Sequence, residues 1–424
     1  MQKHLLALSI SALSLTSSFV NAAPSAFTDA RSFAMGGVGV ASSQPAAASF
    51  FNPALLAVKH RDSKDGFGLI IPSANITVAD EDDLIDDVDK IQQDKLFDKF
   101  SNAIDAAKAN PNSANIQNAI DATNNLNTAL KGINQDTARA DIGAGIAIAI
   151  PGNNFAGALF IDATSKAVIT TNYRDGVFLD QILTDLNNGQ SGNLPSNPED
   201  LLTSDVTGIG AGMAEAGIAL ATSFDMNGSP VAVGVTPKWV ELVSYKYVAS
   251  ANKFEDNNID SNDYETTSTE FNLDLGVAMM FGAQNEWTAG FAIRNLIPMD
   301  IKTVPGGPGL STNTIDIKPN VKVGIAHQSD IHTIAIDLDV TPNKAFSFED
   351  DTQLIAIGAE FNAWDWAQLR IGGRYNIASD VADDGSRGTL TTGFGISPFG
   401  VHLDVAALAN QNELGVAAEL GFTF

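Results

Sequence analysis

The stretch "ADIGAGIAIAI", residues 140–150, alternates between two kinds of residue along its whole length. Its even positions carry Ile or Ala, whereas its odd positions begin with Asp141, Gly143 and Gly145. Side chains on a β-strand point alternately to opposite faces, so this period of two predicts a strand with one apolar face. The same alternation recurs in "FNLDLGVAMMF" (271–281), "IDIKPNVKVGI" (315–325) and "AQLRIGGRY" (367–375), which indicates an all-β chain.

Segments with this alternation number about fourteen, an even count of the kind found in bacterial outer-membrane barrels. The predicted strands are 66–78, 139–150, 155–173, 205–223, 230–248, 265–281, 286–301, 314–326, 331–340, 352–361, 366–377, 387–396, 399–409 and 413–424. A soluble sandwich or solenoid would share this periodicity, so the strands alone leave both architectures open.

The connections between these strands favour a transmembrane antiparallel β-barrel. Short turns such as "PGNN", "DMNGS" and "GAQN" alternate with long connections, and only "NQNE" near the C-terminus departs from the pattern. The long connections are 79–138, 174–204, 250–264, 302–313, 341–351 and 379–386. Outer-membrane barrels have short periplasmic turns and long extracellular loops, so the alternation also assigns the two sides of the membrane.

Aromatic residues cluster beside the predicted short turns, where an interfacial girdle is expected. They are Phe155, Phe224, Phe281, Trp287, Phe361, Trp364, Trp366 and Phe399. The last strand, "ELGVAAELGFTF", ends with Phe422 and Phe424 in the apolar phase. It resembles the C-terminal signal through which the barrel-assembly machinery recognises its substrates. A soluble edge strand ending on Phe is the alternative, but it would expose an aggregation-prone edge.

The ends and composition of the chain bear on its compartment. Residues 1–22 have the charge, apolar run and small residues of a secretory signal peptide, whereas a short membrane anchor is the alternative. The 424 residues include no cysteine, which excludes disulfides and thiolate chemistry. A formal net charge of −26 disfavours direct nucleic-acid binding, which requires clustered basic residues.

Residues 23–59, between the signal peptide and the first strand, are nearly free of charge and contain the turn Gly36–Gly37. "GVGVAS" lacks the third glycine and the preceding strand of a dinucleotide loop, so a nucleotide site is not expected. A barrel of about fourteen strands has a lumen too wide for side chains alone to fill. We therefore predict that this segment is a plug, followed by the barrel over residues 60–424.

The motif Asn52-Pro53-Ala54 within "ARSFAMGGVGVASSQPAAASFFNPALLA" gives this segment a specific resemblance. The stretch resembles the N-terminal hatch of the FadL-like outer-membrane barrels, and within that superfamily most resembles the TraF-type proteins associated with conjugal transfer. The resemblance implies a fourteen-stranded barrel around a hatch, through which apolar molecules pass. It implies that Gly36, Gly37, Asn52, Pro53 and Ala54 set the hatch geometry.

The first long connection contains a helical insertion, because apolar residues recur there at helical spacing. They are Leu84, Ile85, Val88, Ile91, Leu96, Phe97, Phe100 and Ile104, followed after Pro111 by Ile116, Ile120, Leu126 and Leu130. The helices could form an extracellular cap or partner surface. The preferred alternative is a helical pair whose apolar face packs on the barrel mouth, since it requires no partner.

Other polar groups give no strong sign of chemistry. The acidic runs 80–83 and 255–263 could bind calcium, but the second lacks the glycine and final Glu of an EF-hand, so solvated loops are the simpler interpretation. His60, His327, His332 and His402 form no metal or triad motif, and no G-x-S-x-G elbow is present. We therefore expect neither catalysis nor a metal or cofactor.

Charged residues in the polar phase of the strands are expected to face the lumen, because charges facing lipid are costly. They are Asp141, Asp162, Lys238, Asp274, Arg294, Lys318, Lys322, Asp337, Asp339, Arg370, Arg374 and Asp404.

Two functions remain for such an outer-membrane protein of a Gram-negative bacterium. The first is passive transport of a small apolar molecule past the hatch. The alternative is a structural envelope component that serves conjugal transfer through its extracellular loops and protein partners. Either protein would contact outer-membrane lipid, and the identity of a transported ligand is not predicted.

Overall fold

The computed structural model describes residues 27–58, 68–80, 82–152, 155–250, 264–306, 310, 312–343, 351–364, 366–378 and 387–423. The predicted signal peptide (1–22), the first residues of the predicted plug, the acidic run 255–263 and the C-terminal Phe424 lie outside the described residues.

Within the described residues, fourteen antiparallel strands form a closed barrel, which confirms the predicted fold class. They are β1 (Gly68–Asp80), β2 (Thr137–Ile150), β3 (Ala156–Asn172), β4 (Asp205–Met226), β5 (Ser229–Ser250), β6 (Glu265–Phe281), β7 (Trp287–Arg294), β10 (Asn320–Gln328), β11 (His332–Asp339), β12 (Leu354–Trp364), β13 (Ala367–Asn376), β14 (Gly388–Ile396), β15 (Val401–Ala409) and β16 (Glu413–Thr423). Each strand pairs with its neighbours in the chain, and β1 pairs with β16 to close the ring.

The period of two explains why this chain closes into a transmembrane barrel. In β16, Leu414 and Val416 point outward and are 66% and 52% exposed, whereas the alternate residues Glu413, Gly415 and Ala417 are buried. Every strand of the ring has a neighbour on both sides, so the sheet has no free edge strand in the membrane. The aromatic residues Phe155, Phe224, Trp364, Trp366 and Phe399 are exposed at the short-turn end.

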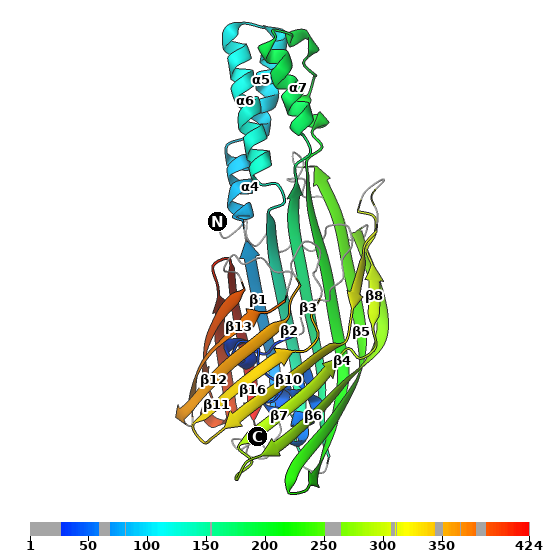
Figure 1. Cartoon of the computed structure of the whole chain (residues 1–424), viewed down its shortest axis with the longest axis vertical. Helices are drawn as coiled ribbons and strands as arrows, with labels where there is room; N and C mark the ends of the chain where they lie inside the picture. Colours follow the sequence, from blue (N-terminus) through cyan, green and yellow to red (C-terminus); the bar gives the residue numbers. More distant parts are fainter. Residues whose placement is uncertain are drawn as a thin grey trace.

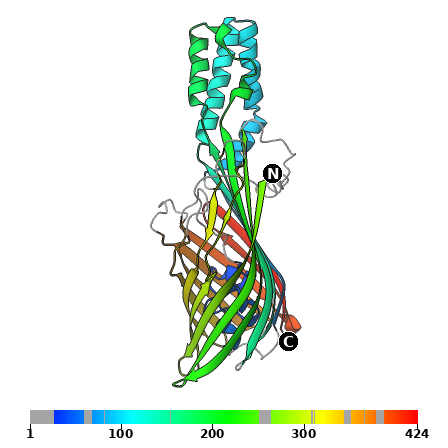
Figure 2. The ribbon, with the colours of Figure 1, turned by 90° about the vertical axis from the view of Figure 1, so that its right-hand side faces the viewer.

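The barrel is not a uniform cylinder. Strands β4 and β5 are 22 residues each, whereas β7 and β11 have 8. The long strands rise beyond the rest of the ring at the end with the long connections, as Figures 1 and 2 show.

Two of the predicted strands, 286–301 and 314–326, are longer than the barrel strands that the structure contains. The segments β8 (Met299–Lys302) and β9 (Thr314–Ile317) instead pair with each other in a separate two-stranded sheet. The prediction was wrong here because the period of two continues through both sheets, while Asn295 at positive φ and Pro319 mark the breaks.

The helices gather at the end with the long connections. In the first connection lie α4 (Leu84–Gln93), α5 (Leu96–Ala109) and α6 (Ser113–Gly132), so the predicted helices are confirmed. The second connection adds α7 (Gly176–Asn187) and two short 3-10 turns, η3 (Ser191–Asn193) and η4 (Pro198–Leu201). The α7 helix was not predicted, although Leu179, Ile182 and Leu186 recur at helical spacing.

Helices α5, α6 and α7 form a bundle that projects away from the barrel (Figures 1 and 2). Their apolar side chains, including Phe100, Leu126 and Ile182, pack against one another in one cluster. The preferred interpretation, packing on the barrel mouth, therefore holds only in part for α5 and α6. Helix α7 packs on their apolar faces, whereas Leu96 and Phe97 of α5 and Ala129 of α6 pack at the mouth. The interpretation holds for α4, whose Leu84 and Ile91 pack with wall residues of β2, β3 and β4. No helix among the described residues has both the length and the hydropathy to cross a bilayer.

Candidate functional site: the hatch and the wall around it

Residues 27–58, which we call the hatch, lie inside the barrel (Figure 2). The hatch consists of α2 (Ala30–Ala34), the 3-10 turn η1 (Pro45–Ala47), α3 (Ala48–Phe51) and the 3-10 turn η2 (Pro53–Ala57). The α2 helix contacts β13 to β16, whereas η2 contacts β3 to β6 on other parts of the ring. The hatch therefore fills the lumen across its width.

Gly36 and Gly37 end α2 in a tight reversal. Both have positive φ, 77° and 91°, which glycine adopts without steric cost. The N–H of Gly37 donates to the carbonyl oxygen of Ser32 at 2.8 Å, the bond that closes a Schellman motif. A Cβ at Gly36 would lie 2.6 Å from the carbonyl oxygen of Gly373 in β13. The glycine therefore serves both the turn and a close approach to the wall.

Asn52 connects three parts of the site with one side chain. Its Oδ1 accepts from the N–H of Ala54 at 3.1 Å and so caps η2. Its Nδ2 donates to the carbonyl of Val40 in the hatch at 2.8 Å and to that of Val277 in β6 at 3.1 Å. Pro53 stands at the first position of η2, where a missing N–H costs nothing. The motif thus fixes the second half of the hatch to the first half and to the wall.

Lumen-facing glycines form pairs across neighbouring strands, and the hatch backbone lies directly on them. The pairs are Gly234–Gly276 (β5 and β6), Gly290–Gly324 (β7 and β10) and Gly358–Gly372 (β12 and β13). A Cβ at Gly234 would lie 2.5 Å from the backbone nitrogen of Ala54. A larger residue at Gly234 would therefore occupy the space of the hatch backbone, and one at its partner Gly276 would meet the side chains of Asn52 and Pro53. We call the glycines of these three pairs the glycine seats.

The other two pairs have matching partners in the hatch. A Cβ at Gly290 would lie 2.8 Å from the carbonyl carbon of Val40. A Cβ at Gly372 would lie 2.5 Å from the backbone nitrogen of Gly36. The three pairs therefore hold three separate segments of the hatch, near residues 35, 40 and 54. Sequence reasoning missed this feature, although the signal was present as glycines in the lumen phase of successive strands.

Arg31 anchors α2 through a buried ion network. Its guanidinium makes two hydrogen bonds with Glu360 of β12, at 2.8 Å and 3.0 Å. Glu360 also accepts from Nε of Arg370 at 2.6 Å, and Arg370 in turn pairs with Asp404. All four side chains are at least 94% buried, so breaking one pair would leave a charge uncompensated.

A second network lies under the other half of the hatch. Glu215 pairs with Lys238 at 2.7 Å and with Arg294 at 2.6 Å, and Lys238 also pairs with Asp274 at 2.9 Å. Arg294 donates to the carbonyl of Phe50 in the hatch at 2.8 Å. The charges of the wall thus pair with one another and with the hatch backbone.

Asp337 of β11 completes the polar contacts with the hatch. One of its carboxylate oxygens accepts from the N–H groups of Gly39 and Val40, at 2.7 Å and 2.9 Å. Most predicted lumen charges therefore lie in the lumen phase, but Lys318 does not. It is exposed between β9 and β10, because the chain there has left the barrel wall.

An apolar cluster lies inside the wall toward the long-connection end. It contains Val168 of β3, Ile209 and Met213 of β4, and Val240 and Leu242 of β5. The apolar residues of the β8–β9 hairpin cover it, namely Met299, Ile301, Ile315 and Ile317. We call this set the upper apolar cluster. It forms a packed apolar layer in the lumen beyond the Glu215 network, which lies further along the same strands.

The ladder between β4 and β5 is interrupted beside the hatch. Pairing stops at Gly217–Lys238 and resumes at Leu220–Val235. Pro237 lies in this gap and has no N–H to donate to the ladder. Buried Ala219, on the β4 side of the gap, packs in one cluster with Leu55 and Leu56 of the hatch.

Other predicted residues have structural roles or new neighbours. Asp80 accepts from the N–H groups of Leu84 and Ile85 and so begins α4. Phe422 pairs in register with Leu69 of β1. A short turn brings Nδ1 of His327 and Nε2 of His332 to 3.1 Å, a contact that no sequence motif indicated.

The sequence of the chain matches one protein family over most of its length. Residues 49–339 match the family described as "F plasmid transfer operon, TraF, protein". The chain belongs to this TraF family. The match begins in the hatch, before the Asn52 motif, and runs to the end of β11. It therefore includes the second part of the hatch and the barrel strands from β1 to β11 in this TraF-family chain. No curated protein sequence matches the chain.

Solved structures resemble the TraF-family chain in fold. A FadL homologue of Pseudomonas aeruginosa is 13% identical, with a TM-score of 0.50 and coverage of 96% of this chain and 99% of that chain. The Pseudomonas putida toluene transporter TodX is 10% identical, with a TM-score of 0.50 and coverage of 96% and 99%. The predicted FadL-like barrel of TraF type is therefore confirmed.

Proposed function

We propose that this protein is a passive channel of the Gram-negative outer membrane that admits a small apolar molecule past its hatch. The observation that carries the proposal is the arrangement of the lumen, in which the upper apolar cluster is followed by a hatch that fills the barrel. The β8–β9 hairpin covers this cluster, so in this proposal the solute reaches it when the hairpin moves aside. An apolar solute gains free energy by leaving water for such a surface, whereas a polar solute does not. The similar TodX barrel is described as a toluene transporter, which supports the same class of solute.

In this proposal the hatch shifts rather than leaves the barrel. Its backbone lies on the glycine seats and its polar groups are paired with the wall, so complete release would expose several buried charges. A local shift of η2 would instead open space beside the interrupted ladder at Pro237. We therefore expect solute flux without a permanent water-filled pore.

The test compares uptake of labelled aromatic hydrocarbons with uptake of a polar solute of similar size in proteoliposomes. The matched variants are the wild-type chain, a deletion of residues 23–59, and a chain with a tethered hatch. Ala46→Cys with Gly68→Cys suits the tether, because a Cβ at position 68 would lie 3.1 Å from that of Ala46. The range that disulfides bridge begins at about 3.5 Å, so only a small adjustment is required. The chain has no native cysteine to compete.

We expect selective apolar uptake by the wild-type protein, unselective flux of both solutes after deletion, and reduced uptake with the oxidised tether that recovers on reduction. Equal uptake of the polar and apolar solutes by the wild type would contradict the proposal. So would wild-type uptake no faster than that of protein-free liposomes.

A structural role in the cell envelope is the second candidate. The family description refers to a plasmid transfer operon, and the α5–α7 bundle projects from the long-connection end, which is extracellular in this proposal. Deleting residues 96–132, which include α5 and α6, together with 176–187, which form α7, would separate the roles. A transfer defect with normal uptake would favour the structural role. Neither candidate involves catalysis or direct contact with nucleic acid, for which the net charge of −26 is unsuitable.

A further inference from the structure

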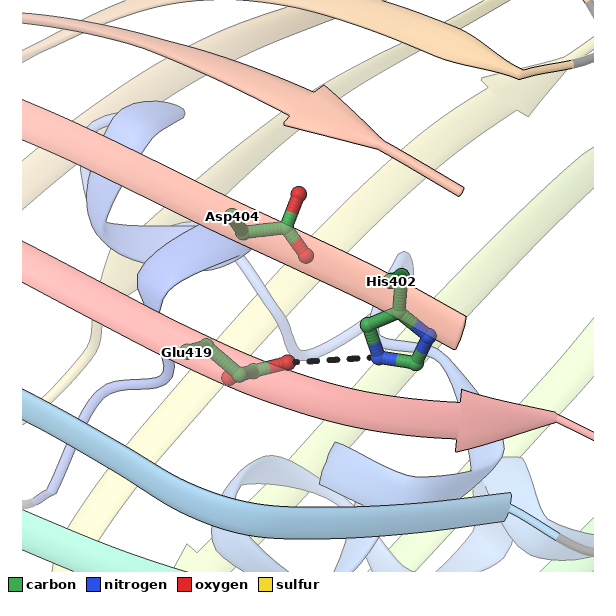
Figure 3. Close-up of side chains that lie close together, drawn as sticks. All are labelled: His402, Asp404 and Glu419. Carbon is green, nitrogen blue, oxygen red and sulfur yellow. Dashed lines mark ion pairs between the residues drawn. The ribbon is translucent and has the colours of Figure 1, made fainter. Parts of the chain in front are cut away.

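His402, Asp404 and Glu419 form a compact group on the lumen face of β15 and β16, close to the short-turn end of the barrel (Figure 3). Asp404 is directly opposite Glu419 in the ladder, and His402 is opposite Gly421. Because Gly421 has no side chain, the imidazole of His402 can lie across the neighbouring strand toward Glu419.

The three side chains have the geometry of a metal site. Each offers one ligand atom, and these atoms lie within 4.8 Å of one another. The Nε2 of His402 and Oε1 of Glu419 are 3.8 Å apart, too far for a strong hydrogen bond between them. One imidazole nitrogen and two carboxylate oxygens are ligands that suit zinc and other first-row divalent cations.

The group and its buried neighbours carry more negative than positive charge. The connected buried groups include two guanidiniums, Arg31 and Arg370, and four carboxylates, Asp29, Glu360, Asp404 and Glu419. With a neutral His402, their formal charge is −2. Uncompensated charge in a buried site is costly, and a bound divalent cation would neutralise it.

Asp29 of the hatch supplies an independent sign of the same deficit. It is 98% buried, and its Oδ1 has no hydrogen-bond partner. Burial, together with the charge of Glu419, raises the pKa of Asp29 to about 7.

We propose that His402, Asp404 and Glu419 bind one divalent transition-metal ion such as Zn²⁺ or Mn²⁺, with Asp29 beside the site. Glu419 also accepts the N–H of Ala30 through its other oxygen, at 3.3 Å. The ion would therefore hold the carboxylate that fixes the start of α2 to the wall. This ion would have a structural role that is separate from the proposed transport.

The test measures metal binding by the intact protein, purified in mild detergent with a tag that contains no histidine. The protein is stripped with EDTA, dialysed, and titrated with Zn²⁺ or Mn²⁺ by isothermal calorimetry, and its metal content is measured by mass spectrometry. The variants are His402→Ala and Glu419→Gln. His327→Ala is the matched control, because His327 is a histidine outside the proposed site, where it contacts His332.

We expect one equivalent of metal in the wild type and in His327→Ala, with at least tenfold weaker binding in both site variants. The apparent Tm of the wild type should rise with Zn²⁺, which tests the site without a substitution that might disturb folding. Two results would overturn the proposal: no metal binding by the folded wild type, or binding that His402→Ala leaves unchanged. His402 and Glu419 would then form an ion pair only. Since uptake is not measured, failure here leaves the channel proposal standing.

Discussion

Replacing Gly372 with alanine places a methyl group where the hatch backbone lies. That Cβ would be 2.5 Å from the nitrogen of Gly36 and 2.7 Å from Cα of Met35, whereas ordinary contact begins near 3.4 Å. The atoms in its way belong to the backbone, so no rotamer change relieves the overlap. The hatch near Gly36 would have to retreat by roughly 1 Å in a tightly packed lumen.

The energetic consequence can be bounded. Forcing an extra methyl group into a well-packed site costs about 1–3 kcal/mol. Here that cost raises the free energy of the state in which the hatch is seated on the wall. The ratio of unseated to seated hatch would therefore rise by about 5-fold to 150-fold. Because the barrel strands themselves are unaffected, the wall should still assemble.

The assay is the conductance of single protein molecules in planar bilayers, with proteolysis of the hatch as a second measure. Gly373→Ala is the matched control, because a Cβ there would meet nothing closer than the Thr389 carbonyl oxygen at 3.2 Å. We expect more frequent open events and faster hatch cleavage in Gly372→Ala alone. Conductance and cleavage identical to the wild type, in a folded Gly372→Ala protein, would refute the assignment of the glycine seats.

Four further outcomes are expected. Asn52→Ala removes three hydrogen bonds at a buried side chain and should raise conductance, with exposed Asn187→Ala as an unaffected control; an unchanged current would contradict the role of Asn52. Arg31→Ala should destabilise the hatch by about 3–5 kcal/mol in thermal unfolding because it leaves Glu360 with one partner fewer, and the double variant with Glu360→Gln should not be worse than Arg31→Ala alone. In metal-free protein the raised pKa of Asp29 means that the folded state holds a proton that the unfolded chain releases, so stability should fall as pH rises from 3.8 to about 7; Asp29→Asn should flatten that part of the profile, and an unaltered slope would count against it. Removal of Phe424 should lower the amount of heat-modifiable barrel in the outer membrane, whereas normal amounts would argue against the C-terminal assembly signal.

Much of the wall was predictable from the sequence because each strand repeats a local pattern. The alternation that begins at Asp141 requires only that one face meets lipid and the other the lumen, and chain neighbours then pair in order. The β8–β9 hairpin escaped prediction for the same reason, since Ile315 and Ile317 alternate just as wall residues do. Their apolar side chains instead pack against the inside of β4 and β5.

The contacts of the hatch could not be predicted in this way, because they join residues far apart in the chain. Arg31 meets Glu360 and Gly36 meets Gly372 only after the ring has closed. The charges in these strands indicated a polar lumen, yet which charge faces which depends on the tilt and register of the whole barrel. Helix α7 differs, because its apolar stripe is present in the sequence. Only its packing against α5 and α6, which belong to another connection, depends on the folded structure.

The contact at Ala30 bears on how the barrel reaches its closed form. A single backbone N–H of the hatch approaches Ser73 of β1 and Glu419 of β16, at 3.2 Å and 3.3 Å, and these two strands are the first and last of the ring. The start of the hatch thus lies across the final seam that must zip during insertion. We therefore expect the hatch to stabilise the junction of the first and last strands, so that plugging of the lumen and closure of the ring are coupled.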